Sequence, residues 1–328
     1  MGLDIKFLDG VELTELHTHV GASVSPTMLW EMAHNQGIKL PTKDYWQFEK
    51  LITLQHKENL EDYLKKFELT ELIQSSPEAM FTAMETAVSG AFRKNNITTL
   101  ELRYNPIFRN RRGERDLDHT IVFSLQGLER ACLKYPVRAG VILCLDRRLS
   151  VNLNKIIVAK AIKYKNRGVV GIDLAGPYTG AIKAKMIKGL VSEAKAAGLG
   201  VTIHTGETPD VQEMWQVVLE LKPDRIGHGI ACVQDKKLMR YLAKEKIVLE
   251  ICPTSNLNTR AVKDYRQLKA IFNSLLEYGV RFTINTDGPE MQQVNLKEEF
   301  RRLFVNHILT EKQLLAANQT AKKASFIL

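Results

Sequence analysis

The sequence predicts an α/β protein of the (β/α)₈ TIM-barrel type, and three observations support this fold class. Eight short apolar, β-branched segments recur along the chain with helical segments between them, as in a parallel sheet with crossover helices. Polar residues able to do chemistry gather at the C-terminal ends of these segments, where barrels assemble their sites. No second domain, repeat or low-complexity tract is visible, so we expect one barrel domain over residues 1–328.

The expected strands follow one another at intervals that leave room for a helix between each pair. In chain order they are VELTELHTH (11–19), TTLELRYNP (98–106), VRAGVILCLDR (137–147), VVGIDLAGP (169–177), GVTIHTGE (200–207), DRIGHGI (224–230), IVLEICPTSN (247–256) and RFTINTDGP (281–289).

Helix starts are marked by serine followed by proline, which suit the N-cap and the first helical position. Ser25 opens the segment 25–37, which ends in glycine, and Ser76 opens 76–96. Between them residues 41–75 have a helical pattern and are too long for a simple loop after the first strand. We expect this insertion to be a helical lid over the site.

The composition is that of an ordinary globular protein, with 45% hydrophobic residues and a formal charge of +9. Most basic residues alternate with acids, which is typical of solvated helix faces and excludes a nucleic-acid stripe. The exception is the stretch 108–115, which carries Arg109, Arg111, Arg112 and Arg115; a solvated loop is the simpler interpretation of it. No signal peptide or membrane span is visible, and the four cysteines lie far apart, so we expect a soluble cytoplasmic protein with reduced thiols.

His17 and His19 stand on the same face of the first expected strand, because successive strand side chains alternate. The pair alone is equally compatible with one core and one surface histidine. His204 ends a later strand, however, and Asp287 ends the last. Three imidazoles and a carboxylate suit Zn²⁺, which lowers the pKa of a bound water toward about 7. We therefore expect these four residues to bind one zinc ion per chain.

Glu207 follows the expected ligand His204 by three residues, beside the metal but free to act as an acid. A protonated carboxyl there could donate a proton to a ring nitrogen while hydroxide attacks the adjacent carbon. His228, between two glycines, could hydrogen-bond that hydroxide; a core histidine with satisfied partners is the alternative. We expect the other histidines to be structural or solvent-facing: His34, His56, His119 and His307.

Over nearly its whole length the chain resembles the adenosine deaminase family of the amidohydrolase superfamily. The matching stretches, in family order, are ELHTHVGAS, ELRYNP, VVGIDLAG, TIHTGE, RIGHGI, EICPTSN and NTDGP. The resemblance implies an enzyme of purine metabolism, a hydrolytic deaminase that converts adenosine to inosine. It implies zinc ligation by His17, His19, His204 and Asp287, proton donation by Glu207 to purine N1, orientation of hydroxide by His228, and a backbone contact of Gly176 with purine N3.

Two positions depart from the family pattern. Gly21 stands where the family usually has an aspartate that contacts the ribose 5′-hydroxyl, and Gly288 stands where a second aspartate contacts the purine near N7. Because lost polar contacts change selectivity, a 5′-modified adenosine such as aminodeoxyfutalosine, a nucleoside phosphate, or adenine is an alternative substrate. Arg109 is a candidate contact for an anionic 5′ group.

An inactive ligand-binding barrel is the remote alternative, which the complete set of expected ligands disfavours. We expect a small purine nucleoside as the partner, with no nucleic acid and no membrane, and the sequence leaves the oligomeric state open.

Overall fold

The computed structural model describes residues 5–111, 116–178 and 183–327. Its eight strands form one sheet in which each strand pairs in parallel with the next along the chain. The strands are β1 (Leu13–His19), β2 (Ile97–Tyr104), β3 (Arg138–Asp146), β4 (Val169–Ala175), β5 (Gly200–Thr205), β6 (Arg225–His228), β7 (Val248–Ile251) and β8 (Phe282–Ile284). This order is that of a (β/α)₈ barrel, which confirms the predicted fold class.

The segment after β8 closes the barrel onto β1. The carbonyl of Asp287 accepts the N–H of His19 at 2.8 Å, and the N–H of Asp287 donates to the carbonyl of His17 at 2.9 Å. Thr18 and Asp287 also form an isolated parallel bridge. Main-chain bonds therefore hold the chemically interesting residues of the first and last strands next to one another.

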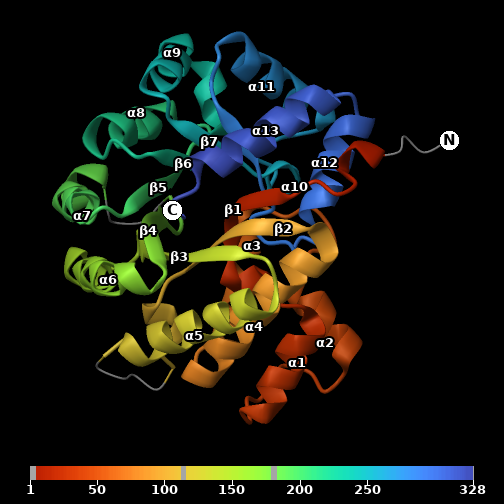
Figure 1. The fold of residues 1–328 in the computed structure, drawn as a ribbon, viewed down its shortest axis with the longest axis vertical. Coiled ribbons are helices and arrows are strands. Elements are labelled where there is room, and N and C mark those ends of the chain that lie inside the picture. The colour runs from red at the N-terminus through yellow and green to blue at the C-terminus, as the bar shows by residue number, and fades with distance from the viewer. Residues whose placement is uncertain (1–4, 112–115, 179–182, 328) are drawn as a thin grey trace.

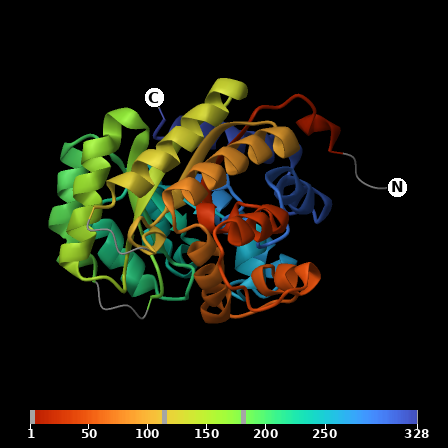
Figure 2. The same ribbon diagram turned by 90° about the horizontal axis from the view of Figure 1, so that it is seen from below.

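Helices surround the strands in the two perpendicular views of Figures 1 and 2. In the described part of the chain the α-helices are α1 (Pro26–Asn35), α2 (Tyr45–Ile52), α3 (Leu60–Ile73), α4 (Pro77–Asn95), α5 (Asp118–Lys134), α6 (Val151–Tyr164), α7 (Ala184–Ala196), α8 (Val211–Glu220), α9 (Lys236–Glu245), α10 (Pro253–Asn258), α11 (Tyr265–Glu277), α12 (Leu296–Val305) and α13 (Glu311–Ala324). Ser25 and Ser76 cap α1 and α4 through hydrogen bonds from Met28 N and Ala79 N, as their positions before proline predict.

The first four helices lie between β1 and β2, so the helical insertion after the first strand is confirmed. Within the predicted stretch 41–75, α2 and α3 are helical. Helix α3 contacts both the 3₁₀ turn Val20–Ala22 after β1 and the turn Ile107–Arg109 after β2. It therefore lies across the C-terminal ends of the first two strands, and its opening and closing as a lid stays a prediction.

The opposite end of the barrel is filled by the C-terminal segment. Phe326 packs where β4 and β5 carry glycine: a Cβ added at Gly171 would lie 2.9 Å from the Phe326 ring, and one at Gly200 would overlap it. The guanidinium of Arg225 stacks over the same ring at 3.6 Å. The backbone N–H of Phe326 donates to Glu101 at 2.6 Å. The chain end thus seals the N-terminal mouth of the barrel.

Two simpler expectations from the sequence concern cysteines and membrane spans. All four cysteines are free thiols, and three of them are buried. Within the described ranges, we find no helix with the length and apolar character that crossing a membrane requires.

Candidate metal centre and active site

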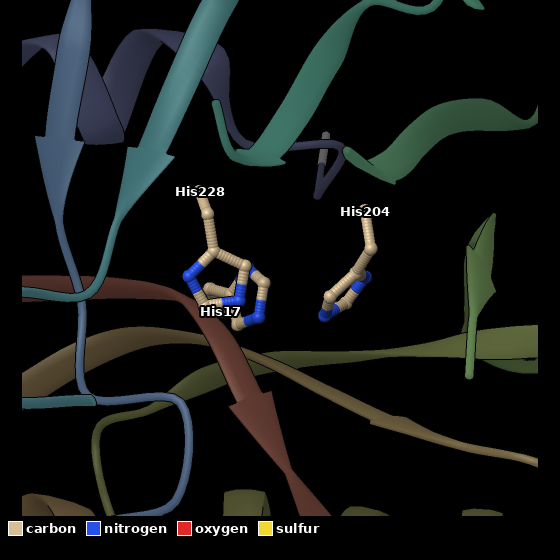
Figure 3. Close-up of side chains that lie close together, drawn as sticks. All are labelled: His17, His204 and His228. Atoms are coloured by element: carbon tan, nitrogen blue, oxygen red, sulfur yellow. The ribbon is translucent and has the colours of Figure 1, made fainter. Parts of the chain in front are cut away.

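Five side chains from four different strand ends converge at the C-terminal mouth of the barrel. His17 and His19 come from β1, His204 from β5, His228 from the last position of β6, and Asp287 from the segment after β8. Figure 3 shows the rings of His17, His204 and His228 reaching into one space from separate elements. The structure therefore brings together the residues that the sequence predicted as metal ligands.

The potential ligand atoms of these residues lie within a few ångströms of one another. His19 Nε2 is 3.2 Å from His204 Nε2. Asp287 Oδ1 lies 3.4 Å from His19 Nε2 and 3.8 Å from His17 Nε2. Two triads have all their ligand atoms within 4.8 Å, His17 with His204 and His228, and His17 with His19 and Asp287. Either spacing can hold one metal ion.

The state of the imidazoles also suits a metal. Burial is the main reason that the pKa values of His17 and His19 fall well below 6.5, and neighbouring cationic groups lower them further. Neutral imidazole is the form that coordinates metals. His17 Nε2 is buried and has no hydrogen-bond partner. An unpaired buried acceptor is costly, and a metal ion at this position would satisfy it.

A buried network behind the cluster orients the histidines. Glu250 Oε2 accepts from His17 Nδ1 at 2.7 Å, and Asp173 Oδ2 lies 2.8 Å from His204 Nδ1, off the line of the ring N–H. Arg103 joins the two carboxylates, at 2.8 Å to Glu250 and 3.0 Å to Asp173. Carboxylates behind metal-binding histidines fix ring orientation and tautomer. This network therefore aims the Nε2 atoms of His17 and His204 at the cluster.

Asp287 and His228 have unusual backbone conformations. Their φ angles are +63° and +62°, in the left-handed region that side chains other than glycine rarely adopt. Ser255 Oγ donates to Asp287 Oδ2 at 2.6 Å, and Asn256 Nδ2 donates to His228 Nδ1 at 3.0 Å. The left-handed turns direct both side chains at the mouth, and these partners from α10 hold them there.

Glu207 lies two residues beyond β5 and is almost fully buried, with 6% exposure. Burial raises the pKa of its carboxyl to about 6, although the nearby His204 and a hydrogen bond oppose the shift. That hydrogen bond is donated by Thr259 to Oε1 at 3.1 Å. The other oxygen, Oε2, lies 3.8 Å from His228 Nε2. Glu207 can therefore hold or release a proton near neutral pH, beside the cluster of ligand atoms.

A pocket opens from this cluster and is roofed by one face of α3. From that helix the pocket is lined by Leu60, Tyr63, Leu64 and Phe67 and also by Glu68 and Glu71, and from the strand ends by residues that include His19, Glu207 and Gly176. The site therefore combines apolar side chains of α3 with polar and charged groups that could orient a small molecule.

The candidate substrate-binding glycines are all places where a side chain would not fit. Gly176 has φ +92°, and an added Cβ would lie 2.7 Å from the carboxylate of Asp146. A Cβ at Gly21 would lie 2.9 Å from the Phe67 ring and 3.1 Å from Arg109 Nη2. The space of the expected aspartate at position 21 is thus occupied by an aromatic ring and a guanidinium.

The arginines that the sequence grouped together do not share one environment. Arg109 lines the pocket with 1% exposure, and Glu71 lies 3.6 Å from its Nη2, while Nε and Nη1 have no partner. Arg111 is exposed and reaches Gln36 at 3.4 Å. Arg148, which follows β3 and is not part of that group, also lines the pocket and donates to both oxygens of Asp146. The other two expected members lie outside the described residues: Arg112 and Arg115.

Sequence reasoning missed Glu250 and Tyr63. Glu250 was inside an expected strand, and a carboxylate in a strand buried on both faces is the signal that could have drawn attention to it. Tyr63 sits in a helix with no local feature that predicts a site. The histidines expected outside the site are all exposed: His34, His56, His119 and His307.

Comparisons with known proteins agree with this geometry. Residues 13–328 match the family model described as adenosine deaminase. An adenosine deaminase of Shewanella loihica is 27% identical over 323 residues, covering 97% of this chain and 95% of that protein.

Two solved structures show the fold at lower identity. Adenine deaminase from Arthrobacter aurescens superposes with a TM-score of 0.83 at 20% identity, covering 96% of this chain and 93% of that one. An N6-methyl-AMP deaminase of Arabidopsis superposes with a TM-score of 0.81 at 22% identity, covering 98% and 94%.

Proposed function

The chain belongs to the adenosine deaminase family, and we propose that it converts the 6-amino group of an adenosine-like purine nucleoside to a 6-oxo group, releasing ammonia. Family membership makes it a hydrolase that acts on carbon–nitrogen bonds. The observation that carries the proposal is a buried acid with a pKa of about 6, Glu207, beside a cluster of imidazoles and one carboxylate that can hold a metal.

Zinc is the proposed ion, and His17, His19, His204 and Asp287 would hold it. The donor set fits, because three imidazoles and one carboxylate are ligands that zinc prefers, and His17 Nε2 is buried without a partner. When bound, zinc would supply Lewis acidity and lower the pKa of a water molecule.

Glu207 is the proposed proton donor to purine N1. Its raised pKa lets part of the population carry a proton at neutral pH, and protonation of N1 makes the adjacent C6 more open to attack. His228 is proposed to orient the attacking water. Asn256 donates to its Nδ1, which places the ring proton on Nε2, the nitrogen nearer Glu207.

Gly176 is the proposed backbone contact of the purine at N3. It lines the pocket with no side chain to shield its main chain, and its positive φ and the nearby Asp146 carboxylate both disfavour any other residue there. Adenosine and adenine both present N1 and N3, so these contacts alone accept either.

The test is ammonia release by the zinc-loaded protein from adenosine, adenine, AMP, methylthioadenosine and aminodeoxyfutalosine. We expect turnover of adenosine and a loss of roughly 10²–10⁴-fold in kcat with Glu207→Gln, which keeps the shape but cannot donate the carboxyl proton. Glu68→Gln, at an exposed position on the pocket rim, is the matched control and should retain activity. If the protein released ammonia from none of these purines, the proposal would be contradicted.

A second candidate substrate is a nucleoside with an anionic 5′ group, and Arg109 is the observation in its favour. Its guanidinium is buried in the pocket wall, and two of its nitrogens, Nε and Nη1, have no partner. A carboxylate or phosphate could pair with them. If this substrate is the true one, Arg109→Gln should lower kcat/KM on AMP or aminodeoxyfutalosine at least roughly 10-fold more than on adenosine. The exposed Arg111→Gln variant is the control, and an equal loss on both substrates would exclude the candidate.

A further inference from the structure

Tyr63 of α3 is a buried phenol with no assigned role. It is 3% exposed and lines the pocket, and its hydroxyl has no hydrogen-bond partner. The ring is fixed by packing against Ala22, Leu54 and Met291. A buried polar group without a partner is costly, so its retention in a pocket wall calls for a ligand or a structural explanation.

The hydroxyl stands beside the metal-binding loop. A Cβ added at Gly288, the residue after the proposed ligand Asp287, would lie 2.8 Å from Tyr63 Oη and 2.7 Å from the methyl group of Ala22. The phenol oxygen therefore occupies the place where any side chain at position 288 would begin. Tyr63 and a side chain at 288 are mutually exclusive in this geometry.

The phenol remains a donor at any ordinary pH. Burial, reinforced by the charges of Asp287 and Glu207, raises the pKa of Tyr63 well above 10. Gln292 opposes that shift slightly, but neither Tyr63 Oη nor Gln292 Nε2 has a partner at hydrogen-bond geometry. Gln292 Oε1 is itself held by Asn258 Nδ2 at 2.7 Å. The Gln292 amide nitrogen and the Tyr63 hydroxyl thus lie at the pocket wall without a hydrogen bond to each other or to another group.

We propose that Tyr63 is a substrate-binding residue that donates its hydroxyl proton to N7 of the purine ring. The inference rests on the proposed function, which puts C6 at the metal cluster and N1 against Glu207. A purine held in this way presents N7, an acceptor, on the other side of C6. The unpartnered donor beside Asp287 is the group placed to meet it, and it requires an acceptor at that ring position.

The test compares adenosine with 7-deazaadenosine, in which a C–H group replaces N7. In the wild type kcat/KM should favour adenosine, and Tyr63→Phe should reduce that preference roughly 10-fold, mostly through loss on adenosine. Comparing both substrates in both proteins cancels the intrinsic difference in their reactivity. Tyr178→Phe is the matched control, because Tyr178 Oη is another buried pocket phenol without a partner but lies at the Gly176 end; the preference should not change in it.

A binding measurement separates this inference from the proposed function. Equilibrium binding of inosine and 7-deazainosine needs no turnover, and Tyr63→Phe should lose roughly 10-fold of the preference for inosine. An unchanged preference in Tyr63→Phe would overturn the Tyr63 proposal even if adenosine is turned over normally. If no purine is turned over but the preference for inosine still depends on Tyr63, the proposed deamination is overturned and the hydrogen bond from Tyr63 to N7 is supported. If the protein binds neither inosine nor 7-deazainosine, both proposals are overturned.

Discussion

Ser255 shows how a single hydroxyl can tune the proposed metal centre. It donates to Asp287 Oδ2 at 2.6 Å and is fully buried. Hydrogen bonds to a metal-binding carboxylate fix its orientation, and their loss typically costs 10–100-fold in metal affinity. We expect Ser255→Ala to weaken zinc binding by roughly that factor in a competition titration with a chelator. Ser89→Ala removes another buried serine that bonds only to a helix carbonyl, and should leave the affinity unchanged.

Glu299 is a residue whose ionisation opposes folding. It is fully buried, and burial raises the pKa of its carboxyl from 4.5 to about 8. Below pH 4.5 both folded and unfolded states are protonated. Between pH 4.5 and 8 the unfolded chain releases this proton while the folded protein keeps it, so stability falls as pH rises through that window and levels off above it.

Glu299→Gln removes this penalty while keeping the acceptor for Thr254 N, which bonds Oε1 at 3.1 Å. The variant should therefore gain Tm relative to the wild type as pH rises from 5 to 9, by at least roughly 2 °C. Glu298→Gln is the control of opposite sign, because Arg301 and Arg302 lower the pKa of Glu298. If Glu299→Gln changed Tm by the same amount at pH 5 and at pH 9, ionisation of Glu299 would not be the cause of the pH dependence.

The proposed metal ligands were predictable one residue at a time, because each lies at or just beyond the C-terminal end of a strand that can be recognised in the sequence. Tyr63 and Glu250 were not. The role of Tyr63 depends on the absence of a side chain at Gly288, more than 200 residues away in the chain. The role of Glu250 depends on its meeting His17 and Arg103 across the barrel. Contacts of that range leave no periodicity in the local sequence.

The type and order of the helices and strands were predictable from the sequence, whereas the residues at which they end were less predictable. The expected strand 247–256 stops at Ile251 in β7, because Pro253 begins α10, and proline suits the first helical position. The expected strand 281–289 is regular only over Phe282–Ile284. Beyond it an isolated bridge from Asp287 to Thr18 continues the pairing with β1, and Asp287 turns its side chain into the mouth with φ +63°.

Helix α3 and Gly21 form one packing unit at the pocket. A Cβ at Gly21 would press on the Phe67 ring of α3 and on Arg109. We expect Gly21→Ala to push α3 outward and to lower kcat/KM roughly 10-fold, at a cost of about 1–3 kcal/mol in stability typical of overpacking. Phe67→Leu in the same chain should recover part of kcat/KM, because it withdraws the ring atoms that the methyl group meets.

The control for this prediction is Gly90→Ala. Gly90 lies inside α4, and a Cβ there meets nothing within 4 Å. Alanine should stabilise that helix by about 0.5–1 kcal/mol without changing kcat/KM. Steady-state kinetics and thermal unfolding are compared for the wild type, Gly21→Ala, Gly21→Ala/Phe67→Leu and Gly90→Ala. Unchanged kinetics in Gly21→Ala would contradict the prediction, because they would show that α3 can move without affecting the pocket.

At the scale of the whole molecule, the two ends of the barrel have different roles: one carries the candidate site, and the other is closed by packing. The C-terminal ends of the strands carry the imidazoles and the pocket, whereas the N-terminal ends are closed by Phe326 and the Arg225–Glu101 ion pair. Barrels generally divide stability and activity between their two faces in this way. Residues at the closed end should therefore affect unfolding without affecting catalysis.

Phe326 provides the test of this division. Phe326→Ala removes a partly buried ring and its cation–π contact with Arg225, and should cost about 2–4 kcal/mol in the free energy of unfolding while kcat/KM stays within roughly twofold. Gly200→Ala should also destabilise the wild type, because its methyl group would overlap the ring. In the Phe326→Ala protein that overlap is gone, so Gly200→Ala should cost at least about 1 kcal/mol less there. Additive costs, or a loss of kcat/KM that parallels the loss of stability, would mean that the two ends of the barrel are not independent.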